Sequence, residues 1–308
     1  MVGAVLTLPS IGCSAWIERI AVRAPNHGVN AVKGEDPLPA RLPPGSNARA
    51  LRVEVGPPAA SLSLWVLDPG SGGPGAAPPP RATIFLLHGW HKEKGRMLRL
   101  AETLTANGYR AIAVDLRGHG RSTGDWMSYG AVEARDLSQT LDALEAKGLA
   151  AGPIGVFGIS YGAAAAIRFA ACDRRVQAVV AVACFSSLRS AIPRYVRLFL
   201  PVFGWLMSEA RIQAAIDRAA ARAGFDPGEA DLVEAIARVE APVLLIHGRG
   251  DWLIPPRNSR ALFRAGNPST QMVLLDGYGH NSVFRDSGGE VKKETVEWFG
   301  RWLGTMSR

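Results

Sequence analysis

The chain has 308 residues, of which 47% are hydrophobic and 20% are charged, and its formal net charge is +8. This composition excludes a globally disordered chain and supplies enough apolar residues for one large core with an insertion. The arginines are scattered, with no run of five like charges and no interleaved aromatic residues. This pattern argues against a nucleic-acid partner and is compatible with association at an anionic membrane surface.

Residues 1–47 are predicted to form a leader, and residues 48–308 the main domain. Residues 1–12 are apolar and are followed by Cys13. Residues 10–13 loosely resemble a bacterial lipoprotein cleavage site. No basic residue precedes this run, and the run is too short to span a bilayer. Two interpretations stay open: a cell-envelope lipoprotein anchored through Cys13, or a cytoplasmic protein whose N-terminal segment packs on the domain.

Strands alternate with helices along most of the main domain. Residues 51–55 and 62–67 have the pattern of an edge hairpin, and residues 69–80 form a connector rich in Gly and Pro. Apolar runs predict buried strands at 83–87, 110–114, 154–157, 176–183, 243–246 and 272–275. Helical spacing predicts helices at 97–107, 129–147, 161–171, 259–264 and 290–303. The alternation predicts an α/β fold with a mostly parallel central sheet and helices on both faces.

Residues 185–240 interrupt this alternation and are predicted to be a helical cap. The segment 197–207 is strongly apolar, and polar helices are expected at 211–223 and 231–239. Phe199 and Phe203 are candidates for an apolar wall that binds the acyl chain of an uncharged substrate. The alternative is that these side chains only pack the cap on the domain.

The candidate nucleophile is Ser160, within Gly158-Ile159-Ser160-Tyr161-Gly162. This G-x-S-x-G pattern follows a predicted strand and opens a predicted helix, which is the setting of a nucleophile elbow. The flanking glycines allow a tight, strained turn, and the helix N-terminus favours developing negative charge. The backbone N–H groups of Trp90 and Tyr161 are the candidate oxyanion hole.

A serine hydroxyl needs a base and an acid that orients this base. Asp251 follows one predicted strand and His280 is expected in the loop after the last one, so both should lie at the carboxyl edge of the sheet. Asp276 is a competitor for the acid but is expected to cap a local turn. His247 is a competitor for the base but ends a buried strand and is expected to hydrogen-bond locally.

Five motifs in this order resemble the α/β-hydrolase superfamily: His88-Gly89-Trp90, residues 115–122, the Ser160 motif, residues 242–248 with Asp251, and Gly279-His280. The closer likeness is to the bacterial serine-aminopeptidase-like (peptidase S33) group, which includes esterases and lipases. The resemblance spans roughly residues 51–303. It implies that residues 115–122 are a structural loop.

The expected function is hydrolysis of a small-molecule carboxylic ester through an acyl-enzyme, with Ser160, His280 and Asp251 as the triad. This chemistry needs no metal and no organic cofactor. One alternative is an aminopeptidase or amidase, which needs an acidic anchor for the substrate amine. The candidates for that anchor are cap residues, namely Glu209, Asp217, Glu229, Asp231 and Glu234. A further alternative is a non-catalytic binding protein that has the same fold.

Overall fold

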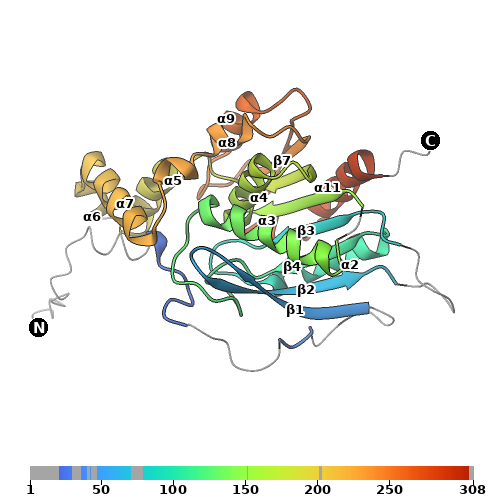
Figure 1. The fold of residues 1–308 in the computed structure, drawn as a ribbon. Helices are drawn as coiled ribbons and strands as arrows, with labels where there is room; N and C mark the ends of the chain where they lie inside the picture. Colours follow the sequence, from blue (N-terminus) through green and yellow to red (C-terminus); the bar gives the residue numbers. More distant parts are fainter. Residues whose placement is uncertain are drawn as a thin grey trace, which may run out of the picture.

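The computed structural model of the protein describes residues 21–29, 36–39, 42, 47–70, 79–150, 152–200 and 203–304. One sheet has eight strands in the order β1-β2-β4-β3-β5-β6-β7-β8 (Figure 1). The strands are β1 (Asn47–Val55), β2 (Ala60–Asp68), β3 (Thr83–Leu87), β4 (Arg110–Val114), β5 (Ile154–Ile159), β6 (Val176–Val182), β7 (Val243–Gly248) and β8 (Gln271–Leu275).

The strand directions agree with the prediction. β1 and β2 form an antiparallel hairpin, and β2 is also antiparallel to β4. Every pairing from β4 to β8 is parallel. The carboxyl ends of these six strands therefore lie at the same edge of the sheet, which is where open α/β sheets build their sites.

Helices cover both faces of the sheet. α3 (Ala131–Ala146) and α4 (Tyr161–Cys172) pack on one face, whereas α2 (Leu98–Ala106) and α11 (Glu290–Leu303) pack on the other (Figure 1). Successive side chains of a strand point to opposite faces. In β3, Phe85 and Leu87 join the first core cluster, and Ile84 and Leu86 join the second. Burial on both faces explains why these strands are continuous apolar runs in the sequence.

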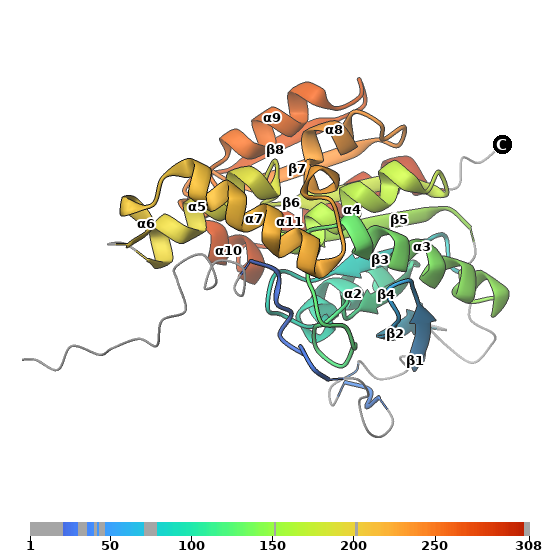
Figure 2. The same cartoon turned by 60° about the vertical axis from the view of Figure 1, so that its left-hand side comes forward.

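The cap lies between β6 and β7 and is helical, as predicted. It contains α5 (Leu188–Phe199), α6 (Phe203–Leu206), α7 (Glu209–Ala223), η2 (Pro227–Ala230) and α8 (Leu232–Ile236). α5 packs against α6 and α7, and Figure 2 shows these three helices together at one end of the molecule. α5 begins after Ser187, whose side chain accepts the Ser190 N–H and so caps the helix. The apolar pattern at 197–207 does not indicate this helix, because most of α5 precedes it.

The leader was expected to be an extended surface segment, and its residues 21–29 pack closely on the domain. Ala21, Val22 and Ala24 are buried. The Asn26 amide donates to the carbonyl oxygens of Gly120 and Ser122, each at 2.8 Å. Residues 21–29 of the leader are therefore part of the folded domain. Cys13 lies outside the described residues.

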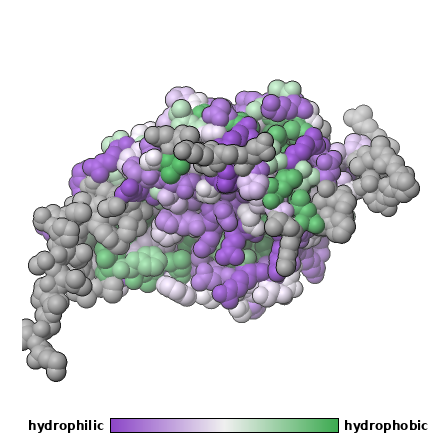
Figure 3. All heavy atoms as spheres, turned by 90° about the horizontal axis from the view of Figure 1, so that it is seen from below, coloured by the Kyte–Doolittle hydropathy of each residue, from purple (hydrophilic) through white to green (hydrophobic). Residues whose placement is uncertain are grey.

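Three more helices complete the described chain: η1 (Lys94–Met97), α9 (Arg257–Ala265) and α10 (His280–Arg285). α10 corrects the prediction, because His280 opens this short helix and does not lie in a loop. In the described part of the chain, we find no helix that combines the length and hydropathy needed to cross a membrane. On the face in Figure 3, hydrophilic side chains cover the middle and hydrophobic ones lie towards the sides.

Candidate active site

Ser160 lies in a strained turn between β5 and α4. Its backbone has φ 54° and ψ −110°, a conformation that costs a non-glycine residue about 1–3 kcal/mol. A Cβ on Gly158 would lie 2.1 Å from the Gly162 carbonyl oxygen, and a Cβ on Gly162 would lie 2.3 Å from that of Leu87. The two glycines are therefore required by close backbone approach. The turn is held by a 2.8 Å hydrogen bond from the Ser160 N–H to the Val182 carbonyl.

His280 and Asp251 are hydrogen-bonded to each other. The distance from His280 Nδ1 to Asp251 Oδ2 is 2.7 Å, and both residues are buried. The loops that carry them are also joined, because the Gly250 N–H donates to the Tyr278 carbonyl at 2.9 Å. Since a carboxylate only accepts hydrogen bonds, Nδ1 carries the proton and Nε2 is left free to accept one. This is the tautomer that a general base needs.

Asp251 is held as a carboxylate. Its Oδ1 accepts the Ile254 N–H at 2.8 Å, and its Oδ2 lies 3.4 Å from His247 Nε2. Burial by itself would raise the pKa of Asp251, but hydrogen bonds from His247 and His280 outweigh burial and lower the pKa from 3.8 to about 2. The group that orients His280 is thus ionised throughout the neutral pH range.

The two competitors have other partners. Asp276 is exposed and forms a 2.7 Å ion pair with Arg249. It therefore does not contact His280, and its partner is a side chain and not the local turn. His247 is fully buried and bonds Ser259 Oγ and the Ile254 carbonyl, each at 2.7 Å. The expected local hydrogen bonding of His247 is confirmed.

The loop after β3 is fixed next to Ser160 and α10. His88 Nε2 accepts the Leu116 N–H at 3.1 Å, so its Nδ1 donates to the Gly89 carbonyl at 2.8 Å. This bond orients the Gly89–Trp90 peptide plane, and the Trp90 N–H points away from the Gly89 oxygen because the peptide is trans. A Cβ on Gly89 would lie 2.5 Å from the ring of Phe284 in α10 and 3.5 Å from the Ile159 carbonyl.

The second candidate donor of the oxyanion hole is the Tyr161 N–H. Tyr161 is the first residue of α4, where amide N–H groups have no acceptor within the helix. Its side chain is buried, and its hydroxyl donates to Glu133 Oε1 at 2.5 Å. This bond fixes the start of α4 beside Ser160. Glu133 was not singled out by the sequence analysis.

Aromatic side chains extend from this loop into the cap. The rings of Trp90 and Tyr195 are stacked, with centroids 6.4 Å apart and planes at 11°, and Tyr195 lies 6.3 Å from Phe199. Phe199 is 52% exposed. The Phe203 side chain lies outside the described part of the structure. Tyr195 was missed, although it precedes Phe199 by four residues and therefore shares its helix face.

The chain was compared with known proteins. A family model described as serine aminopeptidase, S33, matches residues 78–226. The AB hydrolase superfamily protein YisY of Bacillus subtilis is 24% identical and covers 73% of this chain and 91% of its own length. A monoglyceride lipase homolog of monkeypox virus is also 24% identical, over 73% of this chain and 90% of its own.

Solved structures agree with these matches. An esterase from Pyrococcus furiosus superposes with a TM-score of 0.67 at 22% identity, and covers 90% of this chain and 100% of its own. The chain has the α/β-hydrolase fold. The strained Ser160 turn, Asp251 and His280 follow one another along the chain in the order of the motifs found in the sequence.

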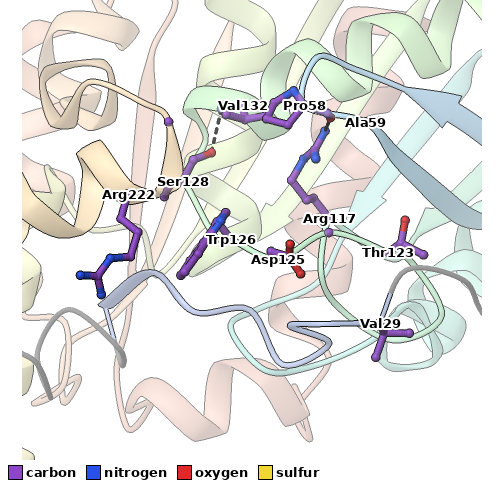
Figure 4. Close-up of a pocket in the computed structure, with 13 residues that line it drawn as sticks. Val29, Pro58, Ala59, Arg117, Thr123, Asp125, Trp126, Ser128, Val132 and Arg222 are labelled. Atoms are coloured by element: carbon purple, nitrogen blue, oxygen red, sulfur yellow. Dashed lines mark hydrogen bonds between the residues drawn. The ribbon is translucent and has the colours of Figure 1, made fainter.

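One cavity of the chain lies apart from the candidate triad. It has a volume of about 350 Å³ and lies between the leader, the β1–β2 turn, the loop before α3 and the end of α7 (Figure 4). Arg117 and Trp126 are among its lining residues, and none of Ser160, Asp251 and His280 is. Arg117 is already paired with Asp136 at 2.7 Å. We therefore do not assign the reaction to this cavity.

Two buried histidines, His88 in the loop after β3 and His119 close to it, make the stability of the chain dependent on pH. We call the loop after β3, which carries the Trp90 N–H, the oxyanion loop. Burial lowers the pKa of His88 from 6.5 to about 4 and that of His119 to about 3. The unfolded chain therefore binds more protons than the folded chain below pH 6.5, and stability falls as the pH falls. For His88, we expect the free energy of unfolding to decrease by about 3 kcal/mol between pH 7 and pH 4.

Urea unfolding at several pH values checks this expectation. The variant His88→Leu should be less stable at pH 7, because the Leu116 N–H loses its acceptor. It should nevertheless lose less stability than the wild type on acidification. An equal loss in both proteins would contradict the assignment of this pH dependence to His88.

Proposed function

We propose that this chain cleaves carboxylic esters through an acyl-enzyme on Ser160. The observation that carries the proposal is the 2.7 Å bond between His280 Nδ1 and Asp251, at the edge of the sheet where the strained Ser160 turn lies. The bond leaves His280 Nε2 as the proton acceptor. A serine at such a turn with an oriented histidine is the arrangement used for acyl transfer.

In the proposed reaction, Ser160 Oγ attacks the ester carbonyl carbon while His280 Nε2 takes the hydroxyl proton. The Trp90 and Tyr161 N–H groups stabilise the oxyanion that forms. His280 then gives the proton to the alcohol oxygen as the ester C–O bond breaks. A water molecule, deprotonated by His280, then attacks the carbonyl carbon of the acyl-enzyme, and His280 returns this proton to Ser160 Oγ as the acid is released. Each step uses protein groups and water, with no metal or organic cofactor.

The alternative of an aminopeptidase needs a carboxylate that binds the substrate amine. Four of the five candidate carboxylates in the cap have other partners: Glu209 pairs with Arg197 at 2.7 Å, and Asp217 pairs with Arg189 at 2.6 Å. Asp231 caps α8, and Glu229 lies 3.8 Å from Arg168. These contacts favour an ester over a substrate with a free amine, as do the esterases among the similar structures.

A panel of p-nitrophenyl esters, run beside aminoacyl p-nitroanilides, tests the proposal. We expect turnover of the esters, no turnover of the anilides, and labelling of Ser160 by a fluorophosphonate. Turnover of the anilides alone would favour the aminopeptidase. A chain that turns over neither substrate and is not labelled would be a binding protein.

The same ester series tests whether Phe199 contacts the acyl chain, with Phe203 as its proposed neighbour. Phe199→Ser should raise KM for long esters and spare the acetate ester, because only a long chain reaches past Tyr195. Trp205→Ser is the matched control, since Trp205 is an exposed aromatic residue of the cap that contacts Arg197. An equal loss for every chain length, with a lower melting temperature, would indicate a packing role.

A further inference from the structure

A second cavity lies beside the candidate acid. It has a volume of about 220 Å³ and is enclosed by α5, the segment after β6, the loop after Asp251 and the start of α9. Its polar lining side chains are Ser186, Ser190, Arg194, Tyr195, Arg257 and Asn258. Two of these residues are arginines, and no Asp or Glu lines the cavity. We call it the arginine pocket.

The arginine pocket adjoins both halves of the candidate active site. Ile254 lines the pocket, and its N–H donates to Asp251 Oδ1 at 2.8 Å. Tyr195 also lines it, and its ring is stacked on Trp90 of the oxyanion loop. The pocket therefore shares Ile254 with the surroundings of Asp251 and shares Tyr195 with the surroundings of Trp90.

The cationic groups of the pocket lack a carboxylate. Arg194 donates its Nε to the carbonyl oxygens of Leu253 at 3.0 Å and of Trp252 at 3.1 Å, and its Nη2 also donates to the Trp252 carbonyl. These bonds tie the guanidinium to the loop after Asp251 and use two of its N–H groups. In the described ranges, neither Arg194 nor Arg257 forms an ion pair with Asp or Glu. A guanidinium has five N–H donors, so several of them are left for a ligand.

The neutral groups of the pocket add a donor. Burial raises the pKa of the Tyr195 phenol well above 10, so its hydroxyl keeps its proton at neutral pH. The Ser186 hydroxyl already donates to Asn258 Oδ1 at 2.9 Å. The forked N–H donors of an arginine guanidinium, together with a phenol hydroxyl, are suited to bind carboxylate or phosphate oxygens. They are unsuited to bind an ammonium group, which is itself a cationic donor.

We propose that the arginine pocket binds a compact oxyanion on the substrate, a carboxylate or a phosphate, so that the preferred ester is negatively charged. This inference rests on the proposed ester hydrolysis and names the substrate class within it. The apolar part of the acyl chain would contact Phe199, while the charged end enters the arginine pocket. This proposal replaces the uncharged substrate that the apolar cap segment predicts. The charge also raises the local concentration of anionic substrates and speeds their association.

A pair of esters of equal chain length tests the proposal. Monoethyl glutarate carries a carboxylate, whereas ethyl pentanoate is neutral, and the hydrolysis of both can be followed in a pH-stat. The wild type should prefer the glutarate ester in kcat/KM. Arg257→Gln should lower the ratio of the two kcat/KM values about tenfold, as expected for the loss of one charged hydrogen bond.

Arg257→Glu should lower this ratio further, because it places a negative charge at the pocket. The matched control is Arg260→Gln, since Arg260 is exposed on α9 and does not line the pocket. The ratio should be unchanged in this control. Equal kcat/KM values for the two esters in the wild type, or an equal effect of Arg257→Gln and Arg260→Gln, would overturn the proposal.

A binding measurement separates this inference from the proposed reaction. Glutarate and inorganic phosphate, titrated calorimetrically into the Ser160→Ala variant, should bind, and Arg257→Gln should weaken the binding. Binding without turnover of any ester would retain the pocket and reject ester hydrolysis. Turnover of neutral esters without anion binding would reject the pocket and retain the reaction. The tighter of the two ligands identifies the preferred oxyanion.

Discussion

Replacing Ser160 or His280 by alanine should lower ester turnover on the order of a million-fold. Ser160→Ala removes the proposed attacking oxygen, and His280→Ala removes the group that we propose takes its proton. Because the members of a triad act as a unit, the double variant should lose hardly more activity than either single one. The measurement is kcat/KM for a p-nitrophenyl ester, with fluorophosphonate labelling in parallel.

Folding must be verified in both variants by the melting temperature. His27→Ala is the matched control for the histidine, because its ring contacts Trp126 and the Asp125 carbonyl, far along the chain from the triad. This control should keep its activity. If His280→Ala keeps normal turnover while folded, another group is the base and the mechanism proposed above is wrong.

Asp251→Asn should lower ester turnover about ten-thousand-fold and leave the fold intact. The reason is visible in the two bonds of the carboxylate. Asp251 Oδ1 accepts the Ile254 N–H and Oδ2 accepts the His280 Nδ1–H. An asparagine that keeps its oxygen towards Ile254 turns its NH₂ group towards His280. The imidazole must then accept at Nδ1 and carry its proton on Nε2, where it can no longer act as a base.

Asp276→Asn is the matched control for the acid. Asp276 precedes His280 by only four residues, but its carboxylate is exposed and pairs with Arg249. An exposed pair of this kind contributes little to stability. We expect near-normal turnover in this variant. Full activity of Asp251→Asn together with loss of activity in Asp276→Asn would reverse the assignment of the acid.

The expected effect of pH on stability also separates Asp251 from the buried histidines. Its pKa is lowered to about 2 in the folded chain, so its contribution is present above pH 4 and is lost as the pH falls towards 2. The stability that depends on the neutral forms of His88 and His119 already decreases as the pH falls below 6.5. Acid unfolding is thus expected to begin with His88 and His119 and to involve Asp251 only later.

Local patterns in the sequence were sufficient for the strands and for naming a candidate triad. A strand buried on both faces must be continuously apolar, and a tight strand–turn–helix must have glycine where backbones approach. These requirements identified β3 to β8 and placed Ser160, Asp251 and His280 at strand ends. Helices that lack such a signature were missed. α5 is one, because its pattern is broken by Pro193, and α10 is another, because it has only six residues.

The sequence by itself determined the α/β fold, the order of the strands along the chain and the positions of the candidate triad residues, because each depends on residues within one short segment. Only the tertiary structure decided which partners these residues have. In the tertiary structure, Asp251 is hydrogen-bonded to His280, which lies 29 residues further along the chain, and Asp276 forms an ion pair with Arg249. Tyr195 of the cap is stacked on Trp90. The tertiary structure also brings Arg194 and Arg257 to one cavity. Contacts between segments distant in the chain depend on how the helices and sheet pack, and no periodicity within a segment specifies them.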